Sequence, residues 1–400
     1  MRITLAAAVL VLSCASTAMP QDATRATPRS LSPADTREVA ERMRRYREAP
    51  VEEPTVAPRA APPTMRAIHL YSSPTGPLEL IVRRGDTAAP LNLFLLDHAG
   101  EVLGLAKEIE GRVDLRKVLP GIEGLSRAAW LQLAQDEAPV GSPIVVHPIR
   151  EPPPVRVKSD LRPQSSVPYT RIVGWGDQPL DPHDTSLDEA KKGWIAGDPP
   201  VLSGYKMYPE MDVLMRTDHG EIVVALAPDE APQTVWNFRT LVREGFYDGG
   251  GFHRVVPADR EGRPFVIQGG DPTMTGNGGP GFALALEPST LAHDYGVISM
   301  ARADEPHSAG SQFFFALGRE ATARLDGQYC AFGYAVSGNR AIDSIAATPL
   351  DDVGEGRPRA IPRIVSMQLV PAPPRMPGID RRESRVKAVV PAGESPPTTR

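Results

Sequence analysis

The sequence predicts a mainly β protein with two β-rich regions and few helices. Short β-like runs, separated by turn signals, recur between residues 65 and 150. A β-hairpin pattern follows at 211–226, where two aliphatic runs flank a turn sequence at 218–220. Next comes one amphipathic helix pattern at 232–242, with apolar residues mostly three or four positions apart. These observations favour a mainly β structure with a few helices.

Composition sets the broad class of the protein. A chain of 400 residues suggests two or three domains. Its 43 prolines exceed the average share and cluster in predicted linkers and tails. The formal charge of -5, with both signs interspersed, argues against a nucleic-acid partner, which would require a basic stripe.

Residues 1–20 resemble an export signal, with a basic start, an apolar run and small residues after it. The sequence VLSC, ending at Cys14, resembles a bacterial lipobox and predicts lipidation of that cysteine. Cleavage after Ala18 would instead give a soluble exported protein. We therefore expect export to the periplasm or anchoring in a bacterial envelope. Only one further cysteine, Cys330, is present; it lies in an apolar run and is expected to be a buried, inert thiol.

The remaining chain divides by composition. Residues 21–64 predict a charged spacer helix and a Pro-rich linker, and residues 65–150 predict a small β-sandwich-like domain for docking or spacing. Residues 151–209 predict an irregular connection, and residues 371–400 a disordered tail. The strands expected in the small domain are 67–71, 78–82, 91–95, 102–105, 129–133 and 144–147.

Residues 210–370 contain the most specific motifs. They are FHRVVP at 252–257, FVIQGGD at 265–271, GSQFFF at 310–315, and LDGQY at 325–329 leading into Phe332 and Gly333. In this order and spacing, the blocks resemble the cyclophilin family of peptidyl-prolyl cis/trans isomerases. The resemblance implies a closed eight-stranded β-barrel capped by two helices. It also implies isomerisation of Xaa-Pro bonds in polypeptides, with no cofactor and no metal.

Arg254 is the candidate catalytic residue. Rotation about a peptide bond requires loss of amide resonance, with a barrier of about 18–20 kcal/mol. A fixed donor directed at the prolyl nitrogen favours the twisted amide, and guanidinium is always charged and offers several donors. No nucleophile is needed for this chemistry, and neither Ser299 nor Ser311 has an evident base partner.

The family resemblance also implies the residues that bind substrate. Phe265, Val266, Phe314 and Leu325 would line an apolar proline pocket. Gln268 would bind the substrate backbone and hold Arg254. The groove beside the pocket would be bordered by Ala301, Arg302 and Gln312. The hydroxyl of Tyr329 would contact the substrate.

Several positions depart from the family pattern. The charged sequence ADREGRP at 258–264 is longer than the usual connection and would form a lip beside the pocket. Arg324 lies where vertebrate members often have tryptophan nearby, which argues against tight cyclosporin binding. Arg302 replaces a common asparagine, and Tyr329 replaces a common histidine.

Two other patterns are interpreted as structural. The sequence GNGGPG at 276–281 matches the consensus of a dinucleotide-binding loop. Such a site needs a helix after the loop, which Pro280 disfavours, so a surface loop is expected. His293, His307 and Asp304 fit no metal-ligand spacing and are expected to be solvated loop residues.

The function predicted is that of an exported prolyl isomerase. Two alternatives remain at this point: a cyclophilin-like chaperone or scaffold that binds Pro-containing segments without turnover, and a protein whose main role is tethering through residues 65–150. Intact Arg254, Phe265, Gln268, Phe314 and Leu325 favour the enzyme.

Overall fold

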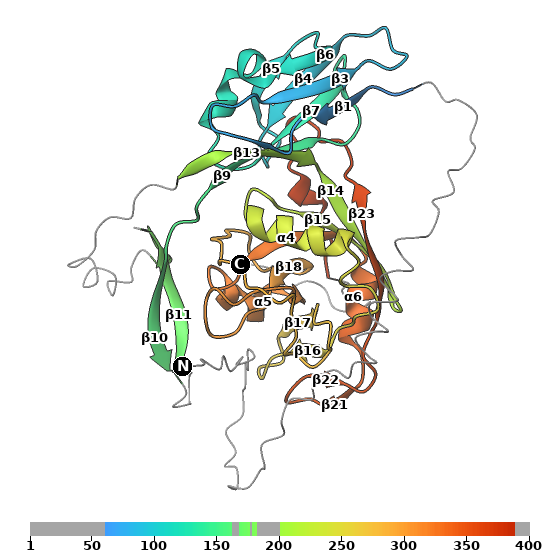
Figure 1. Cartoon of the computed structure of the whole chain (residues 1–400). Helices are drawn as coiled ribbons and strands as arrows, with labels where there is room; N and C mark the ends of the chain where they lie inside the picture. The colour runs from blue at the N-terminus through green and yellow to red at the C-terminus, as the bar shows by residue number, and fades with distance from the viewer. Residues whose placement is uncertain (1–60, 162–167, 177, 182–200, 389–400) are drawn as a thin grey trace, which may run out of the picture. The chain divides into compact units, whose positions relative to one another are not determined.

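The computed structural model describes residues 61–161, 168–176, 178–181 and 201–388 (Figure 1). The predicted signal segment, Cys14 and the spacer helix lie outside the described residues, as does the end of the tail, 389–400. Within the described ranges, no helix is long and apolar enough to cross a membrane.

An eight-stranded antiparallel sheet forms the C-terminal part of the chain, in the order β16-β17-β19-β18-β20-β15-β14-β23. Its strands are β14 (Met211–Thr217), β15 (Gly220–Leu226), β16 (Arg254–Ala258), β17 (Pro264–Gly269), β18 (Val297–Met300), β19 (Phe313–Ala316), β20 (Ala331–Ser337) and β23 (Ile364–Pro371). The predicted hairpin at 211–226 is confirmed, because Thr217 pairs with Gly220 across a two-residue turn.

The curled sheet does not confirm the predicted closed barrel. Its edge strands, β16 and β23, are not paired with each other in the strand order. The chain just before β16 is nevertheless linked to the start of β23 and the residues before it. Phe252 N–H donates to Pro362 O at 2.9 Å, and Ile364 N–H donates to Gly250 O at 3.0 Å. Strand β16, which begins with Arg254, is therefore held near β23 by backbone hydrogen bonds.

Helix α4 (Pro232–Arg243) and helix α6 (Asn339–Ala346) pack on this sheet (Figure 1). Helix α4 contacts β20 and β23, and α6 contacts β15, β16 and β17. The N-terminus of α4 is capped from a distant segment: the carboxylate of Glu287 accepts from Gln233 N at 2.9 Å and Thr234 N at 2.8 Å. The helix stops at the predicted position, where Gly245 takes a φ of 70°.

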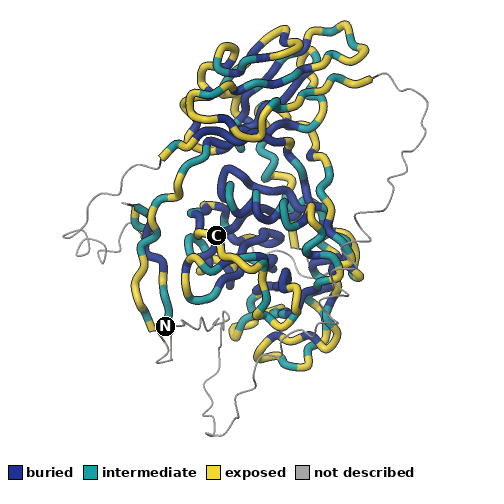
Figure 2. Tube along the Cα trace, in the orientation of Figure 1, coloured by how far each residue is buried: buried dark blue, intermediate teal, exposed yellow. Residues whose placement is uncertain are grey.

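The core between these helices and the sheet is continuous and aromatic. Phe238 of α4 lies 5.7 Å from Phe313 and 4.9 Å from Phe332, measured between ring centroids. All three rings are completely buried, and the strands of this sheet are among the most buried parts of the chain (Figure 2). The strands of this sheet are thus packed against a rigid aromatic core.

Two further sheets form the N-terminal β region. One has the order β1-β3-β6, and the other has the order β2-β13-β9-β7-β4-β5 with β8 beside β7. Apolar residues of both sheets, such as Leu80 and Leu93, share one buried cluster, as expected of a sandwich. The bounds are β1 (Thr64–Ala67), β2 (Tyr71–Ser72), β3 (Glu79–Arg83), β4 (Leu91–Leu96), β5 (Val102–Ala106), β6 (Gly111–Asp114), α2 (Leu115–Val118), β7 (Ala129–Gln135), β8 (Ala138–Pro139), β9 (Ile144–Arg150) and β13 (Leu202–Pro209).

The segment at 151–209 differs from the irregular connection that was predicted. Its described residues form a hairpin of β10 (Val155–Leu161) and β11 (Pro168–Trp175), followed by β12 (Gln178–Pro179). Strand β13 then pairs with β9 and completes the N-terminal sheet. The prolines at 152–154 suggested irregular structure, but they precede β10 and leave its alternating sequence free to pair.

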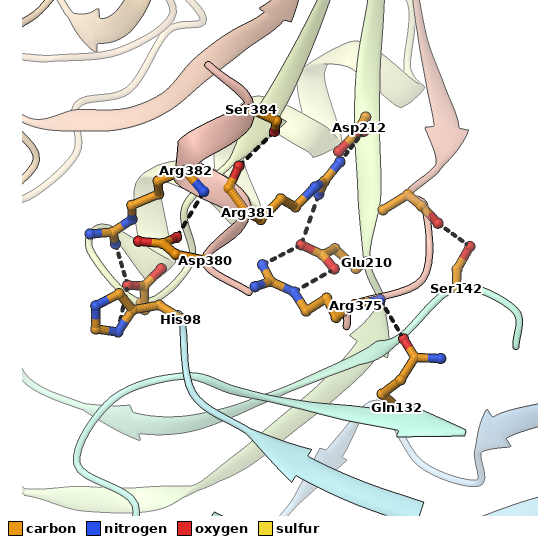
Figure 3. Close-up of polar contacts among 12 residues, drawn as sticks. His98, Gln132, Ser142, Glu210, Asp212, Arg375, Asp380, Arg381, Arg382 and Ser384 are labelled. Carbon is orange, nitrogen blue, oxygen red and sulfur yellow. Dashed lines mark hydrogen bonds and ion pairs between the residues drawn. The ribbon is translucent and has the colours of Figure 1, made fainter. Parts of the chain in front are cut away.

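The segment at 371–388 also differs from the predicted disordered tail, because its arginines have buried carboxylate partners. Arg375 donates to both carboxylate oxygens of Glu210, at 3.0 and 2.8 Å (Figure 3). Arg381 pairs with Glu210 and Asp212. Ion pairing with residues far away in sequence orders a stretch whose own composition suggests disorder.

Candidate functional site

Arg254 begins β16 and is paired across the strands with Gln268 of β17. Its Nη1 donates a long hydrogen bond of 3.4 Å to Gln268 Oε1. Arg254 is half-buried; burial lowers the pKa of its guanidinium, while Glu355 and Tyr329 oppose that effect. The group remains charged, since arginine does not lose its proton in proteins. The structure therefore places Arg254 and Gln268, two of the predicted site residues, within hydrogen-bond distance of each other.

Gln268 is in turn held by a relay of amides. Its Nε2 donates to Gln312 Oε1 at 3.0 Å. Gln312 Nε2 then donates to the carbonyl oxygens of Gly276 and Gly278, at 2.9 and 2.8 Å. Because each amide has a fixed partner, the Gln268 oxygen that faces Arg254 is held in one orientation.

The glycine-rich segment at 276–281 forms a loop without a helix, as predicted. The carboxylate of Asp271 holds this loop, accepting from the backbone N–H groups of Thr273, Thr275, Gly276 and Gly278. The loop therefore serves as the fixed end of the Gln268–Gln312 relay rather than as a phosphate cradle.

The predicted apolar pocket residues come together in one cluster. It contains Phe265 and Val266 from β17, Phe314 from β19, Ala301 after β18, Leu325 and Tyr329, together with Ala321. The rings of Phe314 and Tyr329 meet edge to face, with centroids 5.8 Å apart. Phe265, Val266 and Phe314 come from two paired strands, β17 and β19, so this part of the apolar surface is built on rigid elements.

Arg302 and Tyr329 form one side of this cluster. The guanidinium carbon of Arg302 lies 4.8 Å from the centroid of the Tyr329 ring. Arg302 also donates to the carbonyl oxygens of Gln328, Ala303 and Asp304, at 3.1, 2.8 and 3.0 Å. Burial lowers the pKa of Arg302, while Tyr329 and nearby carboxylates oppose the shift.

The charged sequence at 258–264 forms a compact turn between β16 and β17. Asp259 N–H donates to Arg263 O at 2.8 Å, and Arg263 Nε donates to Asp259 Oδ2 at 2.9 Å. Ala258 then pairs with Pro264 across the two strands. The turn is thus closed by its own ion pair and lies directly between the strand of Arg254 and the strand of Phe265.

His293 is not the solvated loop residue that was predicted. It is buried, its Nδ1 lies 2.9 Å from Asp326 Oδ1, and its Nε2 lies 2.9 Å from Ser299 Oγ. Its ring stacks on Phe314 with centroids 5.8 Å apart. Burial lowers the pKa of His293, although the Asp326 carboxylate opposes the shift. His293 therefore supports the pocket from behind, and it is a basic neighbour of Ser299 that the sequence did not indicate.

Two other residues that support the cluster were not predicted from the sequence. Ala321 belongs to the apolar cluster, and Val256, a neighbour of Arg254 on β16, packs against it. A signal existed for Val256, because alternation along a strand places it on the same face as Arg254. Ala321 lies on a helix of only four residues, α5 (Arg319–Thr322), for which the sequence gives no periodic pattern.

Two chemical alternatives find no support in the described ranges. No group of three or more His, Cys, Asp or Glu residues there could hold a metal ion. Cys330 is a buried free thiol, as predicted, and burial raises its pKa well above the usual range. The site thus combines a charged donor, Arg254 beside Gln268, with an apolar cluster.

The comparisons with known proteins assign the family. Residues 212–369 match the family model described as cyclophilin type peptidyl-prolyl cis-trans isomerase/CLD. Peptidyl-prolyl cis-trans isomerase ppi1 of Schizosaccharomyces pombe is 42% identical over 132 residues, covering 32% of this chain and 79% of that protein. Peptidyl-prolyl cis-trans isomerase B of Bacillus subtilis is 44% identical over 123 residues, covering 30% and 80%.

Other matches cover different shares of the compared proteins. Peptidyl-prolyl cis-trans isomerase CYP57 of Arabidopsis thaliana is 37% identical over 164 residues, but the match spans only 31% of that protein. A crystal structure of a cyclophilin type isomerase from Cryptosporidium parvum is 29% identical, with a TM-score of 0.37, and covers 41% of this chain and 99% of that chain.

The chain belongs to the cyclophilin-type peptidyl-prolyl cis-trans isomerase family. Residues 212–369 form a domain of that enzyme class, and the motif-bearing residues 252–333 lie within it. The N-terminal β region and the segment at 371–388 lie outside the matched range.

Proposed function

We propose that the protein isomerises Xaa-Pro bonds in exported polypeptides and that Arg254 lowers the barrier by donating to the prolyl nitrogen. The geometry of Arg254 beside Gln268, next to the apolar cluster of Phe265 and Phe314, is the observation that carries the proposal. The domain's membership of the isomerase family supports the reaction class.

The proposed mechanism needs no covalent step. Twisting the prolyl amide breaks its resonance, and the nitrogen regains a lone pair that can accept a hydrogen bond. Because this acceptor exists only in the twisted state, a donor fixed on Arg254 stabilises the transition state more than the bound substrate. The amide relay through Gln268 and Gln312 keeps that donor in place, so little reorganisation accompanies the reaction.

The apolar cluster would bind the proline ring. Phe265, Val266, Phe314 and Leu325 offer an apolar surface, and burial of a ring of that size contributes favourable free energy. A Cryptosporidium parvum relative was crystallised in the presence of the dipeptide Ala-Pro, which supports peptide as the ligand class. Ala301 and Gln312 would flank the residues before proline, and Tyr329 would contact the substrate with its hydroxyl.

Isomerisation of short Xaa-Pro peptides tests this proposal. Arg254→Ala is expected to lower kcat/KM by about 10²–10³, the usual effect of losing one donor aimed at a transition state. Arg254→Lys should recover only part of the rate, because an ammonium group lacks the guanidinium fork. Arg260→Ala is the matched control: Arg260 is an exposed arginine of the nearby turn.

The outcomes distinguish enzyme from binding module. A parent protein that is folded, as judged by circular dichroism, yet shows no isomerisation of any peptide would refute the enzymatic role. Binding of Pro-containing peptides under those conditions would then favour the chaperone or scaffold alternative.

The export and anchoring of the protein form a separate part of the proposal. The apolar run within residues 1–20 and the sequence VLSC support it. When the gene is expressed with its own N-terminus in a bacterium fed a labelled fatty acid, the label is expected on the protein and not on Cys14→Ser. A labelled Cys14→Ser protein, or an unlabelled wild type, would refute lipidation; retention of the N-terminal segment in the cytoplasm would refute export.

A further inference from the structure

Three arginines surround the apolar cluster of the site. Arg254 lies on β16, and Arg302 covers the ring of Tyr329. The third, Arg324, has its guanidinium carbon 4.7 Å from the centroid of Phe265. Arg324 belongs to a short 3-10 helix (Ala323–Leu325) whose last residue, Leu325, is itself part of the cluster.

Among the described residues, these arginines have no carboxylate in direct contact with their guanidinium groups. Arg254 donates to the amide of Gln268, and Arg302 donates to backbone carbonyl oxygens. Across the described residues, none of the three guanidinium groups lies within 4.0 Å of a carboxylate oxygen. The edge of the apolar cluster therefore carries an excess of positive charge.

Most carboxylates near the site are paired with other cations. Asp259 and Glu261 both pair with Arg263, and Asp326 pairs with Arg319. Asp326 is also hydrogen-bonded to His293. Glu355 attracts Arg254 electrostatically from a longer distance, and Asp304 and Glu305 attract Arg302 in the same way. These groups reduce the positive potential without contacting Arg324.

Arg324 differs from the other two arginines in being exposed. Its Nε donates to Ala321 O at 3.0 Å, and this bond fixes the plane of the guanidinium against the Phe265 ring. Its two Nη atoms make no hydrogen bond within the described part of the chain. The remaining donors are thus held at the edge of the proline pocket and are accessible to a ligand.

We propose that Arg324 is a specificity residue that selects substrates with an acidic side chain, Asp or Glu, next to the proline. This inference rests on the proposed isomerase function of the same site. A guanidinium group matches a carboxylate with two parallel hydrogen bonds, and stacking on a ring removes part of its conformational freedom before binding. A lysine beside the proline would be repelled by the same arrangement.

The experiment compares peptides that differ only beside the proline. Peptides with Glu, Ala or Lys immediately before proline, and a second set with these residues immediately after it, are assayed for kcat/KM at low salt. For wild-type protein we expect a Glu-over-Ala preference of about five- to tenfold in at least one set, the range of a charge-assisted hydrogen bond partly open to water. Raising the salt should reduce the preference.

Variants of two arginines identify the source of the preference. Arg324→Gln should reduce the Glu-to-Ala ratio to near one, and Arg324→Lys should retain part of it. Arg260→Gln removes the same charge from the exposed turn at 258–264, outside the arginines that surround the pocket, and should retain the full ratio.

Each outcome has one meaning. No Glu preference in wild type, or a preference that survives Arg324→Gln, overturns the specificity proposal while the isomerase function stands. Failure of wild type to isomerise any of the peptides, Ala peptides included, overturns the proposed function itself. Loss of the preference in Arg260→Gln would assign it to general charge rather than to Arg324 and would also overturn the proposal.

Discussion

Replacing Arg375 with methionine should destabilise the protein strongly, because it removes one partner of a buried ion pair. The side chains of Arg375 and Glu210 are only 6% and 4% exposed. Arg375 also lies over Trp130, 3.6 Å from the ring centroid, and its backbone N–H donates to the Gln132 side chain (Figure 3). The pair connects the ordered C-terminal segment with both β regions.

The expected magnitude follows from what remains after the change. Breaking a buried pair by removing one partner costs about 3–5 kcal/mol when the other charge is left uncompensated. Glu210 keeps its contact with Arg381 at 3.1 Å, so the loss should lie near the lower end, about 3 kcal/mol. Methionine retains much of the apolar stem, so most of this loss is electrostatic.

Urea unfolding followed by tryptophan fluorescence measures this effect. If the free energy of unfolding falls by about 3 kcal/mol per M urea, the urea concentration at the midpoint of unfolding should fall by about 1 M. Lys387→Met is the matched control, because Lys387 is an exposed cation of the same segment, and its midpoint should stay unchanged. Adding Glu210→Gln to Arg375→Met should recover part of the loss, since the buried carboxylate that has lost its two hydrogen bonds from Arg375 is then absent.

A midpoint for Arg375→Met within error of wild type would refute the reasoning. It would mean that the ion pair, although buried in the structure, contributes no net stability. Equal losses in Arg375→Met and Lys387→Met would show instead that the segment is sensitive to any change of charge.

Two further predictions concern other parts of the fold. Burial, with help from Lys206, lowers the pKa of His147 to about 4, so below pH 6.5 the unfolded state binds a proton that the folded state does not. The free energy of unfolding should therefore fall by up to about 3 kcal/mol as the pH falls from 6.5 to 4. A His147→Leu variant whose stability falls equally over this pH range would contradict the prediction. The Gln328 side chain holds both backbone groups of Ile172 in β11, at 2.9 and 2.7 Å. Gln328→Ala should speed amide exchange at Ile172 by about tenfold, and unchanged protection would show that the hairpin is held by other contacts.

Local sequence patterns predicted those elements whose signals lie within a few residues. The hairpin of β14 and β15 is specified by its turn sequence and by alternating aliphatic residues. Helix α4 was marked by an apolar stripe, by Pro232 at its start and by Gly245 after its end. Most strands of the N-terminal β region were also found, but the pairing of β13 with β9 was not, because these strands lie far apart in the sequence.

The tail shows what local patterns cannot predict. Its composition indicates disorder, but its arginines pair with carboxylates 152–171 residues away in sequence. The same limit explains His293, whose partner Asp326 lies 33 residues further on. A single sequence does not indicate which distant charges will meet inside the fold.

The candidate site was predictable to the extent that the family motifs contain it. The motifs place Arg254 with Gln268, and Phe265 with Phe314 and Leu325, and the structure brings these side chains together. The motifs do not indicate the stacking of Arg324 on Phe265 or of Arg302 on Tyr329. These contacts depend on side-chain conformations that follow from packing rather than from spacing.

Exchange NMR on a short Xaa-Pro peptide tests the central claim most directly, because it observes cis-trans interconversion at equilibrium without a coupling protease. With a catalytic amount of wild-type protein, exchange should rise from the uncatalysed rate, which corresponds to tens to hundreds of seconds, to many events per second. Arg254→Ala should lower the catalysed rate by about 10²–10³ while peptide binding at the apolar cluster persists. Equal catalysed exchange with Arg254→Ala and wild type would contradict the account, because the barrier would then be lowered by something other than the guanidinium group.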